Sequence, residues 1–294
     1  MKTMTPVERE DATRHEERAS KLANEIVECF GIVAPPVDPF DIAASEAPRL
    51  HIIGDDFRDR FDGQLEYHRT KNRFLLFYNT KLDSLVDRHP RTRFSVAHEL
   101  GHFYIPEHRE LLMRGKGAHP SHTEFSTHWM IERQADAFAA SLLMPRRLMR
   151  KANRKPLTAP IIRNLAKTFQ VSLVSMAIMA VKTSDFPCAV VAYRQGWPAW
   201  QFHSPALAEG KCFPKPKSSI GTPKAQQRWL AFANGSSGSA TADSKAESWF
   251  KLCGRALERD PWVTEHYIES REMATLLVLL TIEERDLFDL QEDD

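Results

Sequence analysis

Apolar residues recur at helical spacing between residues 16 and 30, and Gly31 follows where such a helix should end. A second, short helix is expected at residues 41–46. Three strand-like segments come next, at residues 49–53, 63–67 and 73–78, with turn residues between them. We therefore predict an antiparallel meander. The segment at residues 73–79 is either its edge strand or a central strand with Phe74, Leu76 and Tyr78 in the core.

Two longer helices are predicted in the middle of the chain. Pro90 suits the first turn of one of them, on which Phe94, Ala97 and Gly101 can face the sheet. Because Gly101 lowers helix propensity, we expect another element to pack closely against it. The second helix ends before Pro145 and carries an apolar stripe at helical spacing, formed by Ile131, Ala135, Phe138 and Leu142.

A basic segment follows, in which residues 159–168 and 172–181 are predicted as two helices joined by a tight turn. This is helix-turn-helix spacing, and contact with DNA phosphates is one interpretation. The other is a pair of helices packed on the preceding domain, because residues 172–181 are almost all apolar and lack a base-reading Arg, Asn or Gln. The segment from residue 144 to 184 has no acidic residue but accumulates Arg146, Arg147, Arg150, Lys151, Arg154, Lys155, Arg163, Lys167 and Lys182.

Past residue 186 the pattern changes to that of a small mixed α/β domain. Strands are predicted at residues 188–193 and 200–203, and loops at residues 211–224 and 234–242. Ser244 and Glu247 form a capping-box pattern that predicts a helix to about Glu258. Residues 262–267 and 275–282 are strands, or a strand and a helix. We expect the tryptophans of this half to lie mainly in the core; they are Trp197, Trp200, Trp229, Trp249 and Trp262.

Composition limits the class of protein. The 294 residues are 42% hydrophobic, which is enough for one large domain or two ordinary ones. A net charge of +1 creates no global field that demands nucleic acid or an acidic membrane as partner. The four cysteines are scattered, the N-terminal residues are highly charged, and the longest apolar run, at residues 273–282, is too short to span a bilayer. We expect a soluble cytoplasmic protein with reduced thiols and no membrane partner.

The spacing of three residues in the first of the two longer helices indicates a chemistry. His98 and His102 lie one turn apart on the same helical face, so both imidazoles can reach one ion, and Glu99 projects beside them. This His-Glu-x-x-His pattern is the zincin arrangement. Two histidines leave Zn²⁺ in need of a third protein ligand and a water, and a carboxylate next to the first His can deprotonate that water. We therefore predict that Glu99 is the general base.

Two residues compete for the place of the third ligand. His108 lies at the distance found in metzincins, but Ile105 replaces the glycine that the metzincin turn requires. Glu132 is the stronger candidate, because it borders the apolar stripe of the second helix together with Asp136, one turn further along. One carboxylate can then bind the metal while the other accepts the free N–H of a liganding histidine and fixes its tautomer. We predict Glu132 as ligand and Asp136 as this hydrogen-bonding partner.

These motifs resemble those of the ImmA/IrrE metallopeptidases over about the first half of the chain. The resemblance rests on residues 36–43, on Asp62-Gly63 before the strand at residues 73–79, on residues 93–102, and on Glu132 with residues 135–145. It implies a gluzincin-like site with His98, His102 and Glu132 on zinc. It also implies a regulatory protease that cleaves a DNA-binding repressor, by analogy only. Relatives with a longer C-terminal part carry a GAF-like domain.

The sequence thus predicts an α+β protein in three parts. Residues 1–148 form a zincin-like metallopeptidase domain with a small antiparallel sheet, residues 149–184 a basic helix-turn-helix-like segment packed on it, and residues 185–294 a small α/β domain for which a sensory role is one option. The predicted function is zinc-dependent endopeptidase, with a transcriptional repressor or antitoxin-type protein as substrate. The alternatives are a DNA-associated regulator with a structural or vestigial metal site, and hydrolysis of a substrate that is not a peptide.

Overall fold

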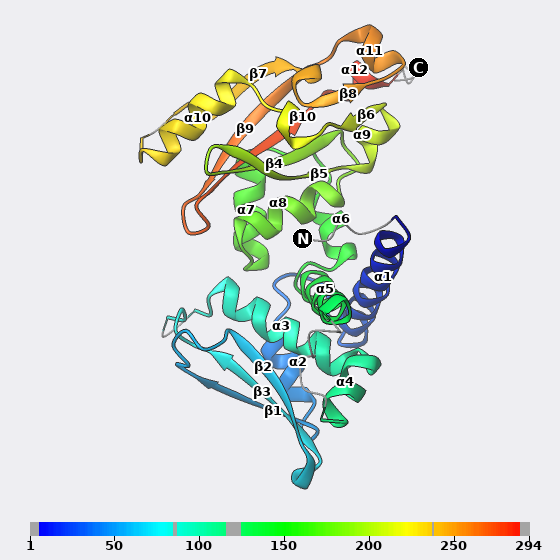
Figure 1. The fold of residues 1–294 in the computed structure, drawn as a ribbon, viewed down its shortest axis with the longest axis vertical. Helices are drawn as coiled ribbons and strands as arrows, with labels where there is room; N and C mark the ends of the chain where they lie inside the picture. The colour runs from blue at the N-terminus through cyan, green and yellow to red at the C-terminus, as the bar shows by residue number, and fades with distance from the viewer. Residues whose placement is uncertain (1–5, 85–86, 116–124, 237, 289–294) are drawn as a thin grey trace. The chain divides into compact units, whose positions relative to one another are not determined.

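The computed structural model of the protein describes residues 6–84, 87–115, 125–236 and 238–288. Helices and small sheets make up a mixed fold, which confirms the predicted α+β class (Figure 1). Contacts divide the chain into an N-terminal unit, Met1–Leu148 with Thr168–Ser172, and a C-terminal unit, Met149–Lys167 with Leu173–Asp294. The domain boundaries near residues 148 and 184 stay predictions.

The N-terminal unit consists of helices around a three-stranded sheet. Its strands are β1 (Leu50–Asp55), β2 (Gly63–His68) and β3 (Arg73–Asn79), close to the predicted ranges. The sheet order is β1-β3-β2, in which β3 pairs with β1 in parallel and with β2 in antiparallel orientation. The predicted meander is therefore wrong, and β3 is the central strand. It has the most apolar sequence of the three, which suits a strand with neighbours on both edges, whereas β2 exposes Gln64 and Glu66.

Five helices accompany this sheet: α1 (Pro6–Cys29), α2 (Pro39–Ser45), α3 (Pro90–Tyr104), α4 (Pro106–Met113) and α5 (Phe125–Leu143). Helix α3 packs against β2 and β3 and also against α5, which in turn packs against α1. A Cβ at Gly101 would lie 3.2 Å from Ala135 Cα on α5. Gly101 therefore allows α3 and α5 to approach closely, which confirms the expected reason for a glycine in this helix.

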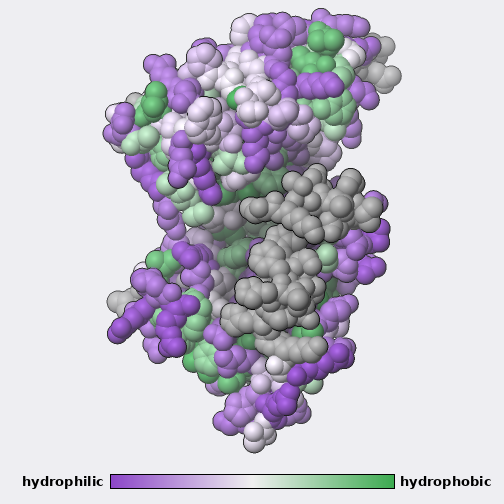
Figure 2. Space-filling model, in the orientation of Figure 1, coloured by the Kyte–Doolittle hydropathy of each residue, from purple (hydrophilic) through white to green (hydrophobic). Residues whose placement is uncertain are grey.

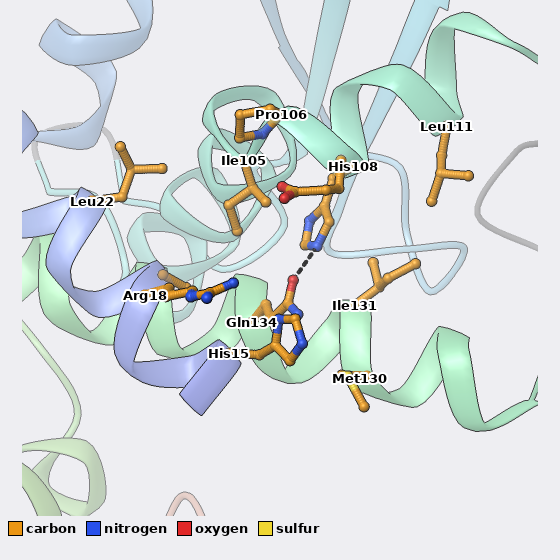
Figure 3. A pocket seen from close by; sticks show the side chains of 12 residues that line it. His15, Arg18, Leu22, Ile105, Pro106, His108, Leu111, Met130, Ile131 and Gln134 are labelled. Carbon is orange, nitrogen blue, oxygen red and sulfur yellow. Dashed lines mark hydrogen bonds between the residues drawn. The ribbon is translucent and has the colours of Figure 1, made fainter. Parts of the chain in front are cut away.

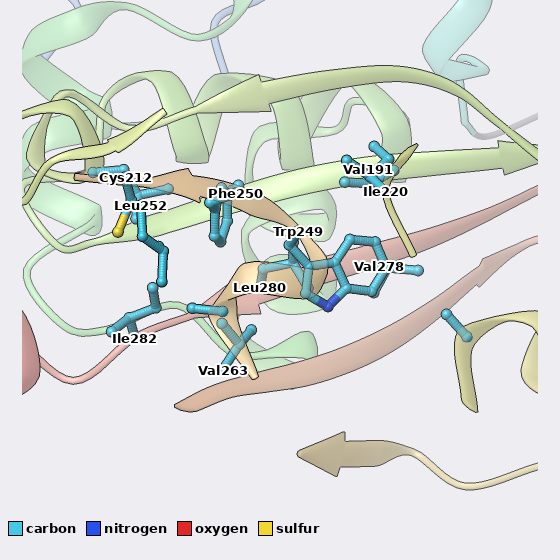
Figure 4. Close-up of a cluster of buried hydrophobic side chains, with 14 of the residues drawn as sticks. Val191, Cys212, Ile220, Trp249, Phe250, Leu252, Val263, Val278, Leu280 and Ile282 are labelled. Carbon is cyan, nitrogen blue, oxygen red and sulfur yellow. The ribbon is translucent and has the colours of Figure 1, made fainter. Parts of the chain in front are cut away.

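The C-terminal unit is built on a five-stranded antiparallel sheet of order β5-β4-β10-β9-β7. These strands are β4 (Cys188–Arg194), β5 (Trp197–His203), β7 (Thr241–Lys245), β9 (Trp262–Ser270) and β10 (Thr275–Thr281); β6 (Cys212–Pro214) and β8 (Phe250–Leu252) form a separate pair. Trp249 and Phe250 pack in an apolar cluster with residues of β4, β9 and β10 (Figure 4). Trp249 is 1% exposed, whereas Trp200 and Trp229 are only partly buried and Trp197 and Trp262 are exposed, so the expectation that these tryptophans lie mainly in the core is wrong.

Several of the helices that accompany this sheet were not predicted from the sequence. The helices are α6 (Arg146–Ala152), α7 (Ala159–Phe169), α8 (Leu173–Lys182), α9 (Pro205–Glu209), α10 (Pro223–Ala233), α11 (Arg255–Arg259) and α12 (Glu284–Leu287). The helix predicted from Ser244 to Glu258 is wrong, because Ser244 belongs to β7 and its hydroxyl accepts a hydrogen bond from Trp249 Nε1 at 3.1 Å. Helix α10 was missed, although Thr222 caps it and Pro223 begins it.

The two helices of the predicted helix-turn-helix segment are confirmed as helices. Helix α8 packs on β4 and β5, and no residue from Leu173 to Val181 is exposed. In the part of the chain that the structure describes, no single helix has the length and apolar composition to cross a bilayer, although α7 and α8, bent by 109°, meet that test together. On the face shown in Figure 2, hydrophilic residues predominate on the surface of both units.

Candidate metal centre

Two helices bring three potential ligands together. His98 and His102 project from one face of α3, and Glu132 projects from α5, which packs on α3 at Gly101. The two histidine Nε2 atoms are 3.1 Å apart. Glu132 Oε2 lies 3.2 Å from His98 Nε2, and its Oε1 lies 3.7 Å from His102 Nε2. Among the described residues, this is the group of His, Cys, Asp and Glu side chains whose geometry could hold a metal ion.

Asp136 lies behind His98, as predicted. Its Oδ1 is 2.9 Å from His98 Nδ1, one helical turn after Glu132. This contact orients the imidazole so that Nε2 faces His102 and Glu132. Burial lowers the pKa of His98, but hydrogen bonds to Asp136 and Glu132 raise it to about 10.

Glu99 lies beside this group without belonging to it. Its side chain is buried, with 8% of the residue exposed, and faces β2. Burial and the charge of Glu132 raise the pKa of Glu99 to about 7, against the lowering effects of His98 and of the Leu65 backbone N–H. A carboxyl group whose pKa lies near neutrality can exchange protons with a reacting water, which is what a general base requires.

A comparison with known proteins agrees with this geometry. Residues 56–180 match the model of the IrrE N-terminal-like domain, Peptidase M78. This part of the chain is an IrrE N-terminal-like domain. The family resemblance predicted from sequence is thus confirmed, and it indicates a metallopeptidase-like or a regulatory function.

Nearly the whole chain also has a counterpart among solved structures. A Mycobacterium tuberculosis transcriptional regulator aligns with a TM-score of 0.54 and 13% sequence identity, over 96% of this chain and 82% of that chain. At this identity the likeness shows the fold alone. No protein in the curated set matches the sequence.

The three side chains of the IrrE-like domain fit a zinc ion. Tetrahedral zinc with ligands at roughly 2.0–2.1 Å places neighbouring ligand atoms about 3.3–3.4 Å apart. The two histidine Nε2 atoms, 3.1 Å apart, and His98 Nε2 with Glu132 Oε2, 3.2 Å apart, come close to that value, while the other carboxylate oxygen, Oε1, lies 3.7 Å from His102 Nε2. Two imidazoles and one carboxylate are also a ligand set that catalytic zinc uses, with the fourth position open.

His108, the competing third ligand, lies elsewhere. It is on α4, is 2% exposed, and its Nε2 is 2.7 Å from Gln134 Oε1. Its ring packs against His102, with 5.1 Å between the ring centroids. Pro106 begins α4 directly after α3, so the chain does not make the turn that would bring His108 to the ligand group.

Sequence reasoning missed the contribution of β2 to this site. A Cβ at Gly63 would lie 3.1 Å from both Cγ and Oε1 of Glu99 and 3.4 Å from Ser95 Cβ. The backbone N–H of Leu65 lies near the Glu99 carboxylate and lowers its pKa. The signal in the sequence was an isolated glycine in a strand pattern, which often marks the close approach of another element.

Proposed function

We propose that the IrrE-like domain is a zinc-dependent endopeptidase. The observation that carries this proposal is the convergence of two imidazoles and one carboxylate, with His98 Nε2 3.1 Å from His102 Nε2 and 3.2 Å from Glu132 Oε2, and with the buried Glu99 beside them. His98, His102 and Glu132 would hold the ion, and Asp136 would orient His98. Family membership supports the same reading.

The side chains around this site have distinct tasks. Bound zinc would lower the pKa of its water and polarise the scissile carbonyl. Glu99 accepts the proton of the attacking water on its carboxylate and returns it to the leaving amine. The Leu65 N–H holds the Glu99 carboxylate in place between these two transfers. Because Glu132 would be a metal ligand, it takes no part in proton transfer.

The edge strand β2 offers a place for an extended substrate. The sheet order leaves one edge of β2 unpaired within the sheet. The Asn79 N–H donates to Asp62 O next to this antiparallel pair, so in the alternating pattern the backbone groups of Gly63, Leu65 and Tyr67 turn away from β3. A peptide added along this edge would pass next to Glu99. Of the two positions that the sequence left open for residues 73–79, the structure has the central one, and β2 is an edge strand.

Two substitutions separate catalysis from metal binding. Glu99→Gln should keep about one zinc per chain and abolish cleavage of an unfolded protein substrate, whereas Glu132→Ala should lose zinc as well. The matched control is Glu110→Gln, an exposed carboxylate paired with Arg114, which should change neither property. Undiminished cleavage by Glu99→Gln would refute the mechanism.

We further propose that the substrate is a cytoplasmic regulatory protein, a transcriptional repressor or antitoxin-type partner. The support is the family resemblance, together with the fold likeness to a protein described as a transcriptional regulator. The experiment compares new protein N-termini in cells that contain either the wild type or Glu99→Gln. A cleaved DNA-binding protein seen only with the wild type is the expected result, and cleavage confined to other protein classes would contradict it.

A second candidate function is supported by the basic segment. Arg150, Lys151, Arg154 and Lys155 are all exposed, as are Arg163 and Lys167 on α7, and no acidic residue lies among them in sequence. In this alternative the chain is a DNA-associated regulator and its metal site is structural. It predicts a salt-dependent mobility shift of duplex DNA that is reduced in a variant with Arg150, Lys151, Arg154 and Lys155 replaced by Gln. Absence of a shift at low salt would exclude it. The buried face of α8 argues against base reading by that helix.

A further inference from the structure

A cavity of about 350 Å³ lies in the N-terminal unit between α1, α4 and α5 (Figure 3). Its volume falls within the range of small-molecule sites, roughly 300–1,000 Å³. The wall is mainly apolar and is formed by Leu22, Ile105, Pro106, Leu111, Met130 and Ile131. A pocket of this kind favours the apolar part of a small ligand.

Hydrogen-bond donors gather on one side of this cavity. Figure 3 shows Arg18 reaching from α1 toward Gln134 of α5, with His15 beside Gln134. Gln134 Oε1 is 2.7 Å from His108 Nε2, which leaves the NH2 group of Gln134 as a hydrogen-bond donor. Arg18 has no carboxylate partner among the described residues, in contrast to Arg14 one turn earlier, which pairs with Asp11. The acidic residue of the lining is Glu107.

We propose that this pocket binds a small carboxylate with an apolar tail. The Arg18 guanidinium and the Gln134 amide hold the carboxylate at the mouth, where a planar guanidinium matches its two oxygens. The tail lies against the apolar wall. Glu107 favours ligands with a single negative charge, because a second negative charge on the tail would be repelled by the Glu107 carboxylate.

The pocket is connected to the candidate metal centre through side chains that contact both. Gln134 follows Glu132 by two residues on α5 and holds His108, whose ring packs on His102. The wall of the pocket and the ligand group therefore share α5 and one layer of side chains. Binding itself does not depend on the proposed peptidase function and is tested without any activity assay.

The experiment is isothermal titration of the full-length protein with octanoate and, separately, with octan-1-ol, which has the same chain length but no charge. We expect octanoate to bind more tightly than octan-1-ol and Arg18→Gln to weaken octanoate by about tenfold or more. The matched control Arg14→Gln, on the same helix, should bind octanoate like the wild type. Ile131→Trp, which fills the apolar wall, should weaken both compounds.

Three results would overturn the proposal. They are no octanoate binding to the wild type, equal affinity for octanoate and octan-1-ol, and octanoate binding that survives Arg18→Gln unchanged. Octanoate that bound at the metal centre instead would also give the last result, because Arg18 is not among the ligand residues. Circular dichroism of each variant confirms that it is folded before titration.

Discussion

Replacement of Gly63 by alanine tests how β2 controls the candidate general base. The new Cβ would lie 3.1 Å from both Cγ and Oε1 of Glu99, and 3.4 Å from Ser95 Cβ. Ordinary carbon contacts are about 3.5–4.0 Å, so Glu99 must move by a few tenths of an ångström. The Leu65 N–H and the burial of Glu99 restrict the directions in which it can move.

The size of the effect follows from this displacement. Catalytic groups work within about 0.5 Å of their productive position, and a misplacement of about 1 Å can cost about 10²-fold in rate. We therefore expect Gly63→Ala to lower kcat about tenfold and Gly63→Val to lower it about 10²-fold. Overpacking should cost about 1–3 kcal/mol of folding stability for the valine. The zinc content should not change, because no ligand atom is touched.

The assay measures kcat for an unfolded protein substrate together with zinc per chain. Gln64→Ala serves as control, because Gln64 lies on the same strand but is exposed. This prediction rests on the proposed peptidase function, and the two fail differently: a zinc-loaded wild type without activity counts against the function. Full activity of a folded, zinc-loaded Gly63→Val variant would refute the positioning argument and leave the function standing.

Three further predictions follow from side-chain contacts. Asp136→Asn should weaken zinc binding about 10–100-fold, measured by competition with a chelator, because the partner of His98 Nδ1 loses its charge. Burial lowers the pKa of His203 to about 4, so the unfolded chain binds a proton between about pH 6.5 and 4 that the native state does not. The free energy of unfolding should therefore decrease as the pH is lowered from about 6.5 to 4, by at most about 3 kcal/mol. Urea unfolding of His203→Phe should show a smaller decrease over the same pH range. Glu265 is fully buried and accepts from Thr222 and Trp249 at 3.0 and 3.2 Å, so Glu265→Leu should cost about 3 kcal/mol or more; a urea midpoint like that of the wild type would contradict this.

The two helices of the candidate metal centre could be predicted because the information for them is local. His98 and His102 share a face through helical geometry alone, and the apolar stripe at Ala135 and Phe138 fixes which side of α5 faces the core. Gly101 added a longer-range hint, since a glycine inside a helix suggests a close neighbour, and that neighbour is Ala135 of α5. The third ligand that the histidine pair requires, the place of Glu132 and Asp136 beside the apolar stripe, and the family resemblance together led to Glu132.

The order of the strands and the hydrogen-bond partners of polar side chains depend on residues far apart in the sequence, so they could not be predicted from local patterns. The patterns of β1, β2 and β3 indicated strands but carried no information on which pairs form, and β3 took the central place between the other two. Ser244 and Glu247 had the spacing of a capping box. Their helix did not form, because the serine hydroxyl serves as a hydrogen-bond acceptor for Trp249, whose ring lies in the core. Tertiary burial of a large aromatic residue outweighs the stabilisation of one helix cap.

The candidate site combines both kinds of information. Helices α3 and α5 contribute side chains whose chemistry is visible in the sequence. Strand β2 contributes a backbone N–H at Leu65 and the absence of a side chain at Gly63, and neither has a chemical signature of its own. A glycine in a strand becomes meaningful only when the element opposite it is known, and that element is α3, far along the chain. Residue types therefore lead to the ligands and the base, whereas the strand that holds the base in position is found only from the fold.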